Sequence, residues 1–176
     1  QGVAQFDYLL VTLHRAENVD DHARLTSIME GLSLTAERYG KPCLVSVHPR
    51  TASKLAEFGI APSSNKVRLL EAMGFFDFVK LEKNALAVLS GTVQEECCIF
   101  KIPNVTLRDV TERAETIECG SNILSGASPQ AIVSAVELAL AQPASWTPPS
   151  EYTEPNVSST VTRIVLGYLS QRRHNS

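Results

Sequence analysis

The sequence predicts a doubly wound α/β domain with a parallel, Rossmann-like sheet. Short apolar runs alternate along the chain with segments whose apolar residues recur every three or four positions. The runs are typical of buried parallel strands and the longer spacing of amphipathic helices, and their alternation indicates successive βαβ units. Polar or glycine-containing residues follow the runs, as expected where such strands end at a ligand-binding crevice.

The first half of the chain supplies the central strands. The expected order is strand 7–13, helix 20–39, strand 43–47, strand 67–70, helix 75–85 and strand 86–89. The first helix is predicted from apolar residues spaced like Leu25 and Ile28. Asp20 or Asp21 is the expected N-cap, and Gly40 lies where the helix should end.

The second half of the chain continues the alternation of strands and helices up to residue 141, and a proline-rich segment follows. The expected order is helix 93–100, strand 104–107, helix 112–119, strand 122–124, helix 129–141 and helix 158–172. Four prolines between residues 142 and 155 predict an extended linker. The expected organisation is therefore a Rossmann-like domain over 1–142, a linker over 143–157 and a C-terminal helix within 158–176.

Composition argues against several functional classes. The formal charge is −3 and no basic block stands out, so nucleic-acid binding is not expected. No apolar run approaches the roughly 18 residues of a membrane span. The four cysteines lack C-x-x-C spacing and are expected to be buried thiols in a reducing cytoplasm. Because the sequence opens at Gln1 and runs almost directly into a strand, we expect a piece of a longer protein.

Charged side chains gather just after the predicted strands. Residues 14–18 (HRAEN) follow the first strand, and residues 48–51 (HPRT), whose turn Pro49 fixes, follow the second. Ser90-Gly91-Thr92 opens a helix, where free backbone N–H groups favour an anion. Residues 108–113 (RDVTER) add two guanidinium groups suited to phosphate. Convergence at one sheet edge predicts a site for a polyanionic ligand with hydroxyl groups, such as a phosphorylated sugar or nucleotide.

Each motif also has a simpler interpretation that stays open. A histidine at a strand end is more often a structural hydrogen-bonding group than a catalyst. Ser-Gly-Thr before a helix is often only a cap, and Glu95 with Glu96 can form a solvated helix face. The convergence of the motifs, rather than any one of them, favours a binding site.

Six ordered motifs resemble those of the bacterial, non-hydrolysing UDP-N-acetylglucosamine 2-epimerases. They are residues 14–20 (HRAENVD), 47–51 (VHPRT), 74–78 (GFFDF), 93–96 (VQEE), 111–115 (TERAE) and 120–122 (GSN). The resemblance extends over roughly residues 7–170. It implies the second of two Rossmann-like domains in a fold of the glycosyltransferase-B type, with a closing helix that crosses back to the absent first domain.

The resemblance also implies a reaction and its setting. UDP is eliminated from the sugar to give a 2-acetamidoglucal and is then added back, with the proton returned to the opposite face of C2. No metal or cofactor is implied. The expected partners are a UDP-sugar substrate and, as in some family members, a UDP-N-acetylglucosamine activator, in a cytoplasmic homodimer that serves polysaccharide biosynthesis.

Particular residues match the functional positions of that family. His14 matches the catalytic histidine beside the departing UDP, where it would act as an acid or a cation. The matches to substrate-binding positions are Ser90, Gly91 and Thr92 in the diphosphate loop, Glu96 at the ribose hydroxyls, Arg113 at the phosphates, and Met73 and Phe78 around the uracil. Arg15 and His48 match residues that hold a second, allosteric UDP-N-acetylglucosamine in some members.

Two departures keep alternatives open. The loop at residues 89–92 is two residues shorter than the family pattern, and Ala114 stands where the family has proline. The acid/base carboxylates that act on C2 are expected in the absent domain, so the chain alone is expected to be inactive. The alternatives are a 2-epimerase of a modified UDP-sugar (the UDP-N-acetylfucosamine or diacetamido-uronic acid type), a non-catalytic nucleotide-sugar-binding module, or a glycosyltransferase domain.

Overall fold

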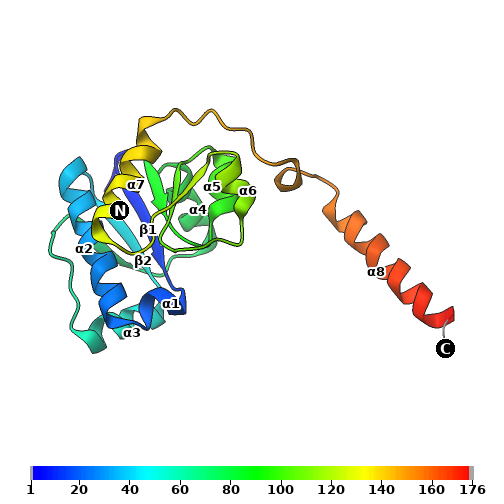
Figure 1. The fold of residues 1–176 in the computed structure, drawn as a ribbon, viewed down its shortest axis with the longest axis horizontal. Helices are drawn as coiled ribbons and strands as arrows, with labels where there is room; N and C mark the ends of the chain where they lie inside the picture. Colours follow the sequence, from blue (N-terminus) through cyan, green and yellow to red (C-terminus); the bar gives the residue numbers. More distant parts are fainter. Residues whose placement is uncertain (1, 175–176) are drawn as a thin grey trace.

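The chain forms one layered α/β unit from which a C-terminal arm extends (Figure 1). A computed structural model describes residues 2–174, with side chains placed as far as Tyr168. The last two residues of the C-terminal segment expected over 158–176 therefore lie outside the described part.

Six parallel strands form the central sheet. They are β1 (Leu9–Leu13), β2 (Cys43–Val47), β3 (Val67–Glu71), β4 (Ala87–Leu89), β5 (Asn104–Thr106) and β6 (Asn122–Leu124). Their order across the sheet is β3-β2-β1-β4-β5-β6, and Leu9 of β1 pairs with Cys43 on one side and Ala87 on the other. This order confirms the predicted doubly wound fold, and it places the topological switch point between β1 and β4.

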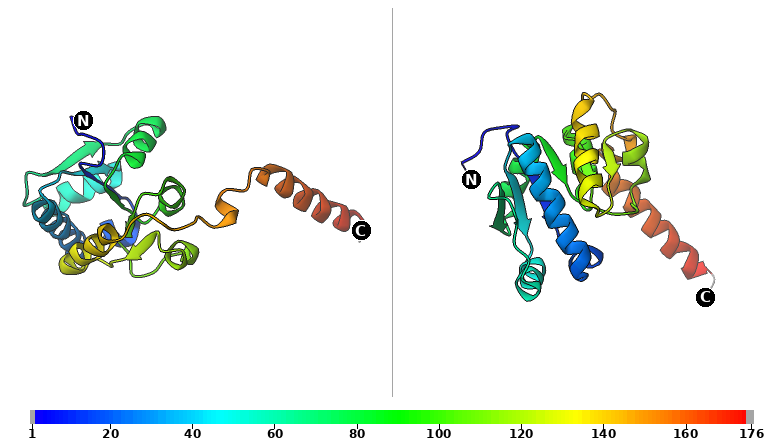
Figure 2. Two further views of the ribbon diagram at one scale, coloured as in Figure 1. Left: turned by 90° about the horizontal axis from the view of Figure 1, so that it is seen from above. Right: turned by 60° about the vertical axis from the view of Figure 1, so that its left-hand side comes forward.

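Helices connect the strands and cover both faces of the sheet (Figure 2). Those up to the linker are α1 (Ala16–Val19), α2 (His22–Tyr39), α3 (Pro49–Phe58), α4 (Phe75–Lys83), α5 (Gln94–Phe100), α6 (Ala114–Glu118) and α7 (Pro129–Ala141). The helices α1 and α3 are not predicted by the sequence, which indicates loops at residues 14–18 and 48–51. Pro49 was expected to fix a turn, but it is the first residue of α3. At this position the missing N–H of proline costs nothing, because it would have no partner within the helix.

Alternation along β1 divides the core in two. Leu9, Val11 and Leu13 face a large cluster that the helices α1, α2, α3 and α7 cover. Tyr8 and Leu10 belong to a smaller cluster on the opposite face, beneath α4 and α5. Both faces of β1 are buried, which explains why its sequence is a continuous apolar run.

The cysteines are distributed differently from the sequence expectation. Cys43, Cys97 and Cys98 are buried thiols, as expected, but Cys119 is only partly buried. It lies directly after α6, at the surface of the layer that holds α5 and α6.

The C-terminal arm begins with contacts to the sheet domain and then leaves it. In the proline-rich segment, the indole N–H of Trp146 donates to the carbonyl of Cys98 at 3.0 Å, and the Tyr152 hydroxyl donates to Glu115 at 2.6 Å. After a 3-10 turn (Ser150–Tyr152), α8 (Val157–His174) extends away from the body in all three views (Figures 1 and 2). Within the described residues, no helix is long and apolar enough to cross a membrane.

Candidate functional site

The candidate site lies at the switch point, where β1 and β4 end side by side. The hydroxyls of Thr12 and Ser90 form a short hydrogen bond between the two strand ends. Ser90 is fully buried, and its oxygen also accepts the backbone N–H of Thr92 at 3.2 Å. The buried Ser90 hydroxyl therefore holds the loop in place by hydrogen bonds. The next two residues of the loop, Gly91 and Thr92, are partly exposed.

Gly91 is required by the close approach of Arg108. A Cβ at position 91 would lie 2.8 Å from the Cδ of Arg108, well inside contact distance. Arg108 is itself buried, and its Nε donates to the Glu17 carboxylate of α1. The sequence suggested two guanidinium groups for phosphate, but Arg108 is already engaged and ties α1 to the segment that follows β5.

A small polar pocket opens over this loop. It has a volume of about 40 Å³ and is lined by Arg15, Gly91, Thr92, Gln94, Glu95, Arg108, Glu112 and Arg113. Its guanidinium and carboxylate groups partly pair with one another: Arg113 Nε donates to Glu95, and an Arg15 nitrogen lies 3.9 Å from Glu112. The pocket thus joins residues that follow β1, β4 and β5.

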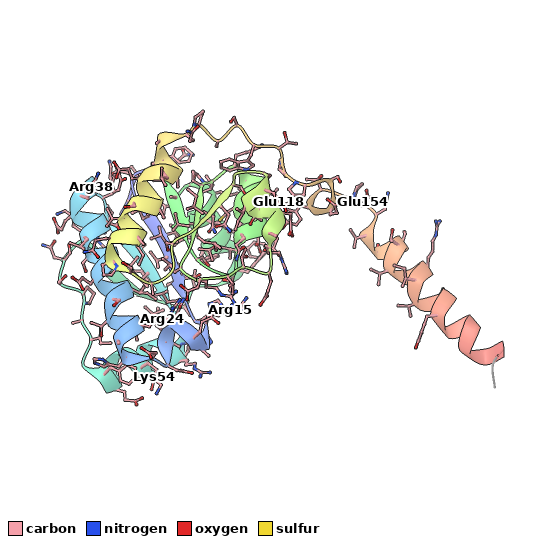
Figure 3. All side chains as sticks on the ribbon, in the orientation of Figure 1. Arg15, Arg24, Arg38, Lys54, Glu118 and Glu154 are labelled. Atoms are coloured by element: carbon pink, nitrogen blue, oxygen red, sulfur yellow. The ribbon has the colours of Figure 1, made fainter. Side chains whose placement is uncertain are left out.

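Arg15 retains one donor without an acceptor. Its Nε atom is buried, and no acceptor lies within hydrogen-bond distance among the described residues. A buried N–H of this kind costs about 1–3 kcal/mol unless a partner is supplied. Figure 3 shows the labelled Arg15 side chain next to α1.

A buried polar network underlies the pocket and was missed by the sequence analysis. Gln94 donates to the carbonyl of Gly91 at 3.1 Å and accepts from Thr111 at 2.6 Å and Asn122 at 3.3 Å. Asn122 in turn accepts from Asn104 at 2.8 Å. Gln94 therefore links the loop after β4, the segment after β5 and β6. The signal in the sequence is an asparagine at the buried first position of each of the two short strands β5 and β6.

His14 and His48 approach each other at the ends of β1 and β2. Their ring centroids lie 6.4 Å apart, and both side chains are exposed. Partial desolvation of the ring, then the charge of Arg15 and the neighbouring His48, lower the pKa of His14. His48 has a structural role as well, because its Nδ1 accepts the backbone N–H of Arg50 at 3.2 Å and caps α3.

Glu95 and Glu96 differ in their surroundings although they are adjacent on α5. Glu95 pairs with Arg113, whereas no hydrogen-bond donor or cation engages the Glu96 carboxylate among the described residues. The charge of Glu96 helps to raise the pKa of the buried Glu82 of α4. Glu96 is thus a half-buried carboxylate with its acceptor positions free.

Met73 and Phe78 are not brought to the same pocket. Met73 lines a separate pocket of about 450 Å³ with Asp77, Lys80 and residues 3–5. Phe78 packs against the smaller core cluster. The two pockets share no lining residue, so the predicted role of Met73 and Phe78 around a base stays a prediction.

Comparisons with known proteins point to one family. The family described as UDP-N-acetylglucosamine 2-epimerase matches residues 1–166. A Methanocaldococcus jannaschii protein named UDP-N-acetylglucosamine 2-epimerase is 47% identical over 148 residues, which are 81% of this chain and 40% of that protein. A Pseudomonas aeruginosa protein named UDP-2,3-diacetamido-2,3-dideoxy-D-glucuronate 2-epimerase is 38% identical over 142 residues, 79% of this chain and 39% of that protein.

Structural similarity agrees with the sequence matches. The crystal structure of the M. jannaschii UDP-GlcNAc 2-epimerase in complex with UDP-GlcNAc and UDP superposes with a TM-score of 0.85 at 43% identity. The match covers 93% of this chain and 46% of that chain. The chain therefore spans less than half the length of the relatives it matches.

Proposed function

The chain belongs to the UDP-N-acetylglucosamine 2-epimerase family, and from this we propose that it is the UDP-binding half of a UDP-sugar 2-epimerase. The observation that carries the proposal is the polar pocket at the switch point, where Arg15, Gly91, Thr92 and Arg113 converge. Ligands of doubly wound sheets bind beyond the carboxyl ends of the strands at this point.

The proposed diphosphate position is supported by the charges of the pocket. Arg15 has a buried Nε donor without an acceptor, and Arg113 is held by Glu95 at the surface. A diphosphate oxygen can accept from both guanidinium groups, which bind phosphate in a planar, bidentate manner. The partial exposure of Gly91 and Thr92 lets the ligand approach the backbone of the loop.

The proposed ribose position is Glu96. A carboxylate offers acceptors for the two donors of a vicinal diol, and that of Glu96 has no competing donor among the described residues. Because α5 carries both Glu95 and Glu96, one short helix would contact the phosphate side and the ribose side of a nucleotide.

His14 is proposed as the catalytic residue of this half. Elimination of UDP leaves a negative charge on the diphosphate, and an imidazole at the end of β1 can stabilise that charge as an acid or a cation. The groups that act on the C2 proton are proposed to lie in the part of the enzyme that this chain does not span. We therefore expect the isolated chain to bind a UDP-sugar but not to convert it. We expect the reaction of the whole enzyme to need no metal and no cofactor.

Calorimetric titration of the chain with UDP tests the proposal. We expect saturable 1:1 binding, and a loss of about 1.5–3 kcal/mol of binding free energy in Glu96→Ala, as for a hydrogen bond to a charged group. Glu118→Ala, on the last turn of α6, is the matched control and should bind like the parent chain. Absence of UDP binding up to millimolar concentration, with intact folding, would overturn the proposal and favour a module that lacks nucleotide affinity.

The sugar is proposed to be either UDP-N-acetylglucosamine or a diacetamido-uronic acid derivative. The first candidate is supported by the 47% identity to the M. jannaschii relative, and the second by the 38% identity to the P. aeruginosa relative and by the GFFDF motif at residues 74–78. Turnover of both substrates by a chain that includes the other half separates the two. Conversion of neither would leave only nucleotide-sugar binding.

For the whole protein we propose a cytoplasmic homodimer of polysaccharide biosynthesis. Arg15 and His48 are proposed to contact an activating UDP-N-acetylglucosamine. His48 lies at the end of β2, outside the diphosphate pocket, and Arg15, which also lines that pocket, would lie between the two ligands. Sedimentation of the whole protein tests the dimer. Sigmoidal kinetics that become hyperbolic in His48→Ala would support the activator.

A further inference from the structure

Two thiols lie side by side between α5 and the end of α6. The Sγ atoms of Cys98 and Cys119 are 3.7 Å apart, although the residues are 21 positions apart in the sequence. A disulfide bond measures about 2.05 Å, and small rotations about the two Cα–Cβ bonds move sulfur atoms by such a difference. The other two thiols face elsewhere: Cys43 approaches the carbonyl of Leu32, and Cys97 donates to Glu82.

One thiol of the pair is accessible from solvent. Cys98 is fully buried, whereas Cys119 is partly exposed and lines a pocket of about 320 Å³. Gly120, Ser121 and Trp146 line the same pocket. Trp146 is fixed in place because its indole N–H donates to the carbonyl of Cys98. The pocket therefore leads a small reagent to Cys119 first, with Cys98 directly behind it.

The two thiols differ in burial, and this difference sets the order of reaction. The Cys119 Sγ lies 3.5 Å from the Ser121 hydroxyl and 3.5 Å from the carbonyl of Thr116. Burial raises the pKa of Cys98 above its ordinary value, which keeps that thiol protonated and unreactive until a partner sulfur is presented. The more exposed thiol would attack and the buried thiol would resolve.

We propose that Cys98 and Cys119 form a dithiol site that exchanges with low-molecular-weight disulfides such as glutathione disulfide. The Cys119 thiolate attacks one sulfur of the reagent; a protein–reagent S–S bond forms, the reagent's S–S bond breaks, and one thiolate leaves and takes up the proton released by Cys119. The Cys98 thiolate then attacks the Cys119 sulfur and expels the second reagent thiolate, which takes up the proton of Cys98. Two protein thiols are oxidised and one disulfide is reduced to two thiols.

The bond would connect two elements of the candidate site. α5 carries Glu95 and Glu96, and Arg113 is the residue that precedes α6. A covalent link at the far end of both helices would hold the Glu95–Arg113 side of the pocket together. The chemistry of the pair is independent of the proposed function, because it requires no UDP and no turnover.

Peptide mapping of the oxidised chain tests the proposal. The folded, reduced chain is incubated with glutathione disulfide, blocked with an alkylating agent and digested with trypsin without reductant. We expect a peptide of residues 84–101 joined to one of residues 114–163, which separates on reduction. Detection of no joined peptide, or of one only after unfolding in urea, would overturn the proposal.

Single variants identify the sulfurs. The peptide of residues 84–101 also contains Cys97, so Cys97→Ala is the matched control and should keep the link. Cys98→Ala should abolish it and leave the reagent attached to Cys119, whereas Cys119→Ser should leave no adduct. A link that survives in Cys98→Ala but disappears in Cys97→Ala would contradict the assignment.

Thermal unfolding provides a second readout that does not depend on Cys98→Ala, the variant of the buried thiol. Closing a loop of about 20 residues stabilises a domain of this size enough to raise the melting temperature by several degrees. We expect that rise on oxidation of the parent chain and its absence in Cys119→Ser. A fall in the parent chain on oxidation would show that the native packing of α5 and α6 does not accommodate the bond, which contradicts the proposal.

Discussion

At the residue scale, the surroundings of His14 make its protonation sensitive to a bound anion. Desolvation and the charges of Arg15 and His48 lower the pKa of the imidazole in the unliganded chain. A diphosphate beside the ring would reverse the electrostatic part of this effect, because an opposite charge favours the protonated form. A protonated His14 would then supply the cation that is proposed to stabilise the departing UDP.

We therefore predict that UDP binding takes up protons at His14. Calorimetry at pH 7 in buffers of different ionisation enthalpy should show proton uptake, and the UDP affinity should rise by up to about tenfold as the pH falls from 8 to 6. His14→Ala should abolish both effects. His22→Ala, whose ring packs on Phe58, is the matched control. Unchanged proton uptake in His14→Ala would assign the effect to another group.

Glu82 is a second residue whose environment controls its charge. Its side chain is 1% exposed, one oxygen accepts from Cys97 at 3.3 Å, and the other has no donor among the described residues. Burial raises the pKa of Glu82 from 4.5 to about 7, with the nearby Glu96 adding to the effect. The folded state therefore prefers the neutral acid.

This preference predicts a loss of stability as the pH rises. Below pH 4.5 the carboxyl is protonated in both states. Between 4.5 and about 7 the unfolded chain releases the proton while the folded chain keeps it, so the free energy of unfolding falls with pH and levels off above 7. At about 1.4 kcal/mol per pH unit, the difference amounts to about 3 kcal/mol. Urea unfolding at pH 8 should show Glu82→Gln to be more stable than the parent; a variant of equal or lower stability would contradict this account.

At the element scale, α5 and the loop before it are held in place by hydrogen bonds of buried side chains. Gln94 connects Gly91, Thr111 and Asn122, and the Ser90 hydroxyl connects β4 to β1 through Thr12. The helix α5 is short and has no capping side chain, so its own hydrogen bonds leave backbone groups at its N-terminus without partners. The side-chain network holds this segment in position instead. The position of the loop is thus set by buried amides and hydroxyls rather than by the loop's own residues.

We predict that Gln94→Ala destabilises the fold and weakens UDP binding together. Removal of the amide leaves the Asn122 Nδ2 and the Thr111 hydroxyl without this acceptor, at a cost of about 1–3 kcal/mol. Chemical denaturation and UDP titration measure the two effects. A double-mutant cycle with Asn122→Ala should show coupling, since the two side chains share one network. Strict additivity would mean that the network does not act as a unit.

Much of the order of strands and helices is predictable from the sequence. The features that are not predictable, among them α3 and the Arg108–Glu17 pair, have physical reasons. The strands were found because residues such as Leu10 are buried on both sides of a parallel sheet and leave a continuous apolar signal. α3 was missed because Pro49 signals either a turn or a helix start, and only the His48 cap decides. The engagement of Arg108 by Glu17 could not be predicted, because the two residues are 91 positions apart and α1 itself was not expected.

At the scale of the whole molecule, the sheet domain has its own core, whereas none of the described side chains of α8 belongs to a core cluster. Both faces of the sheet are covered by helices that belong to the sheet domain, whereas Val161, Ile164 and Leu166 of α8 are 52%, 66% and 61% exposed. An amphipathic helix gains most of its stability from packing its apolar face. The helix α8 is thus proposed to pack on the part of the enzyme that this chain does not span.

We predict that removing α8 leaves the sheet domain intact and reduces self-association. A chain that ends at residue 156 keeps the Trp146 and Tyr152 contacts, so its melting temperature should stay within about 2 °C of the parent. The exposed apolar side chains of α8 should make the parent chain associate at high concentration, and the shortened chain should sediment as a monomer. The variant Ile164→Glu, in the otherwise full chain, is the matched control and should also reduce association. A large fall in melting temperature on truncation would show instead that α8 folds back onto the sheet domain in solution.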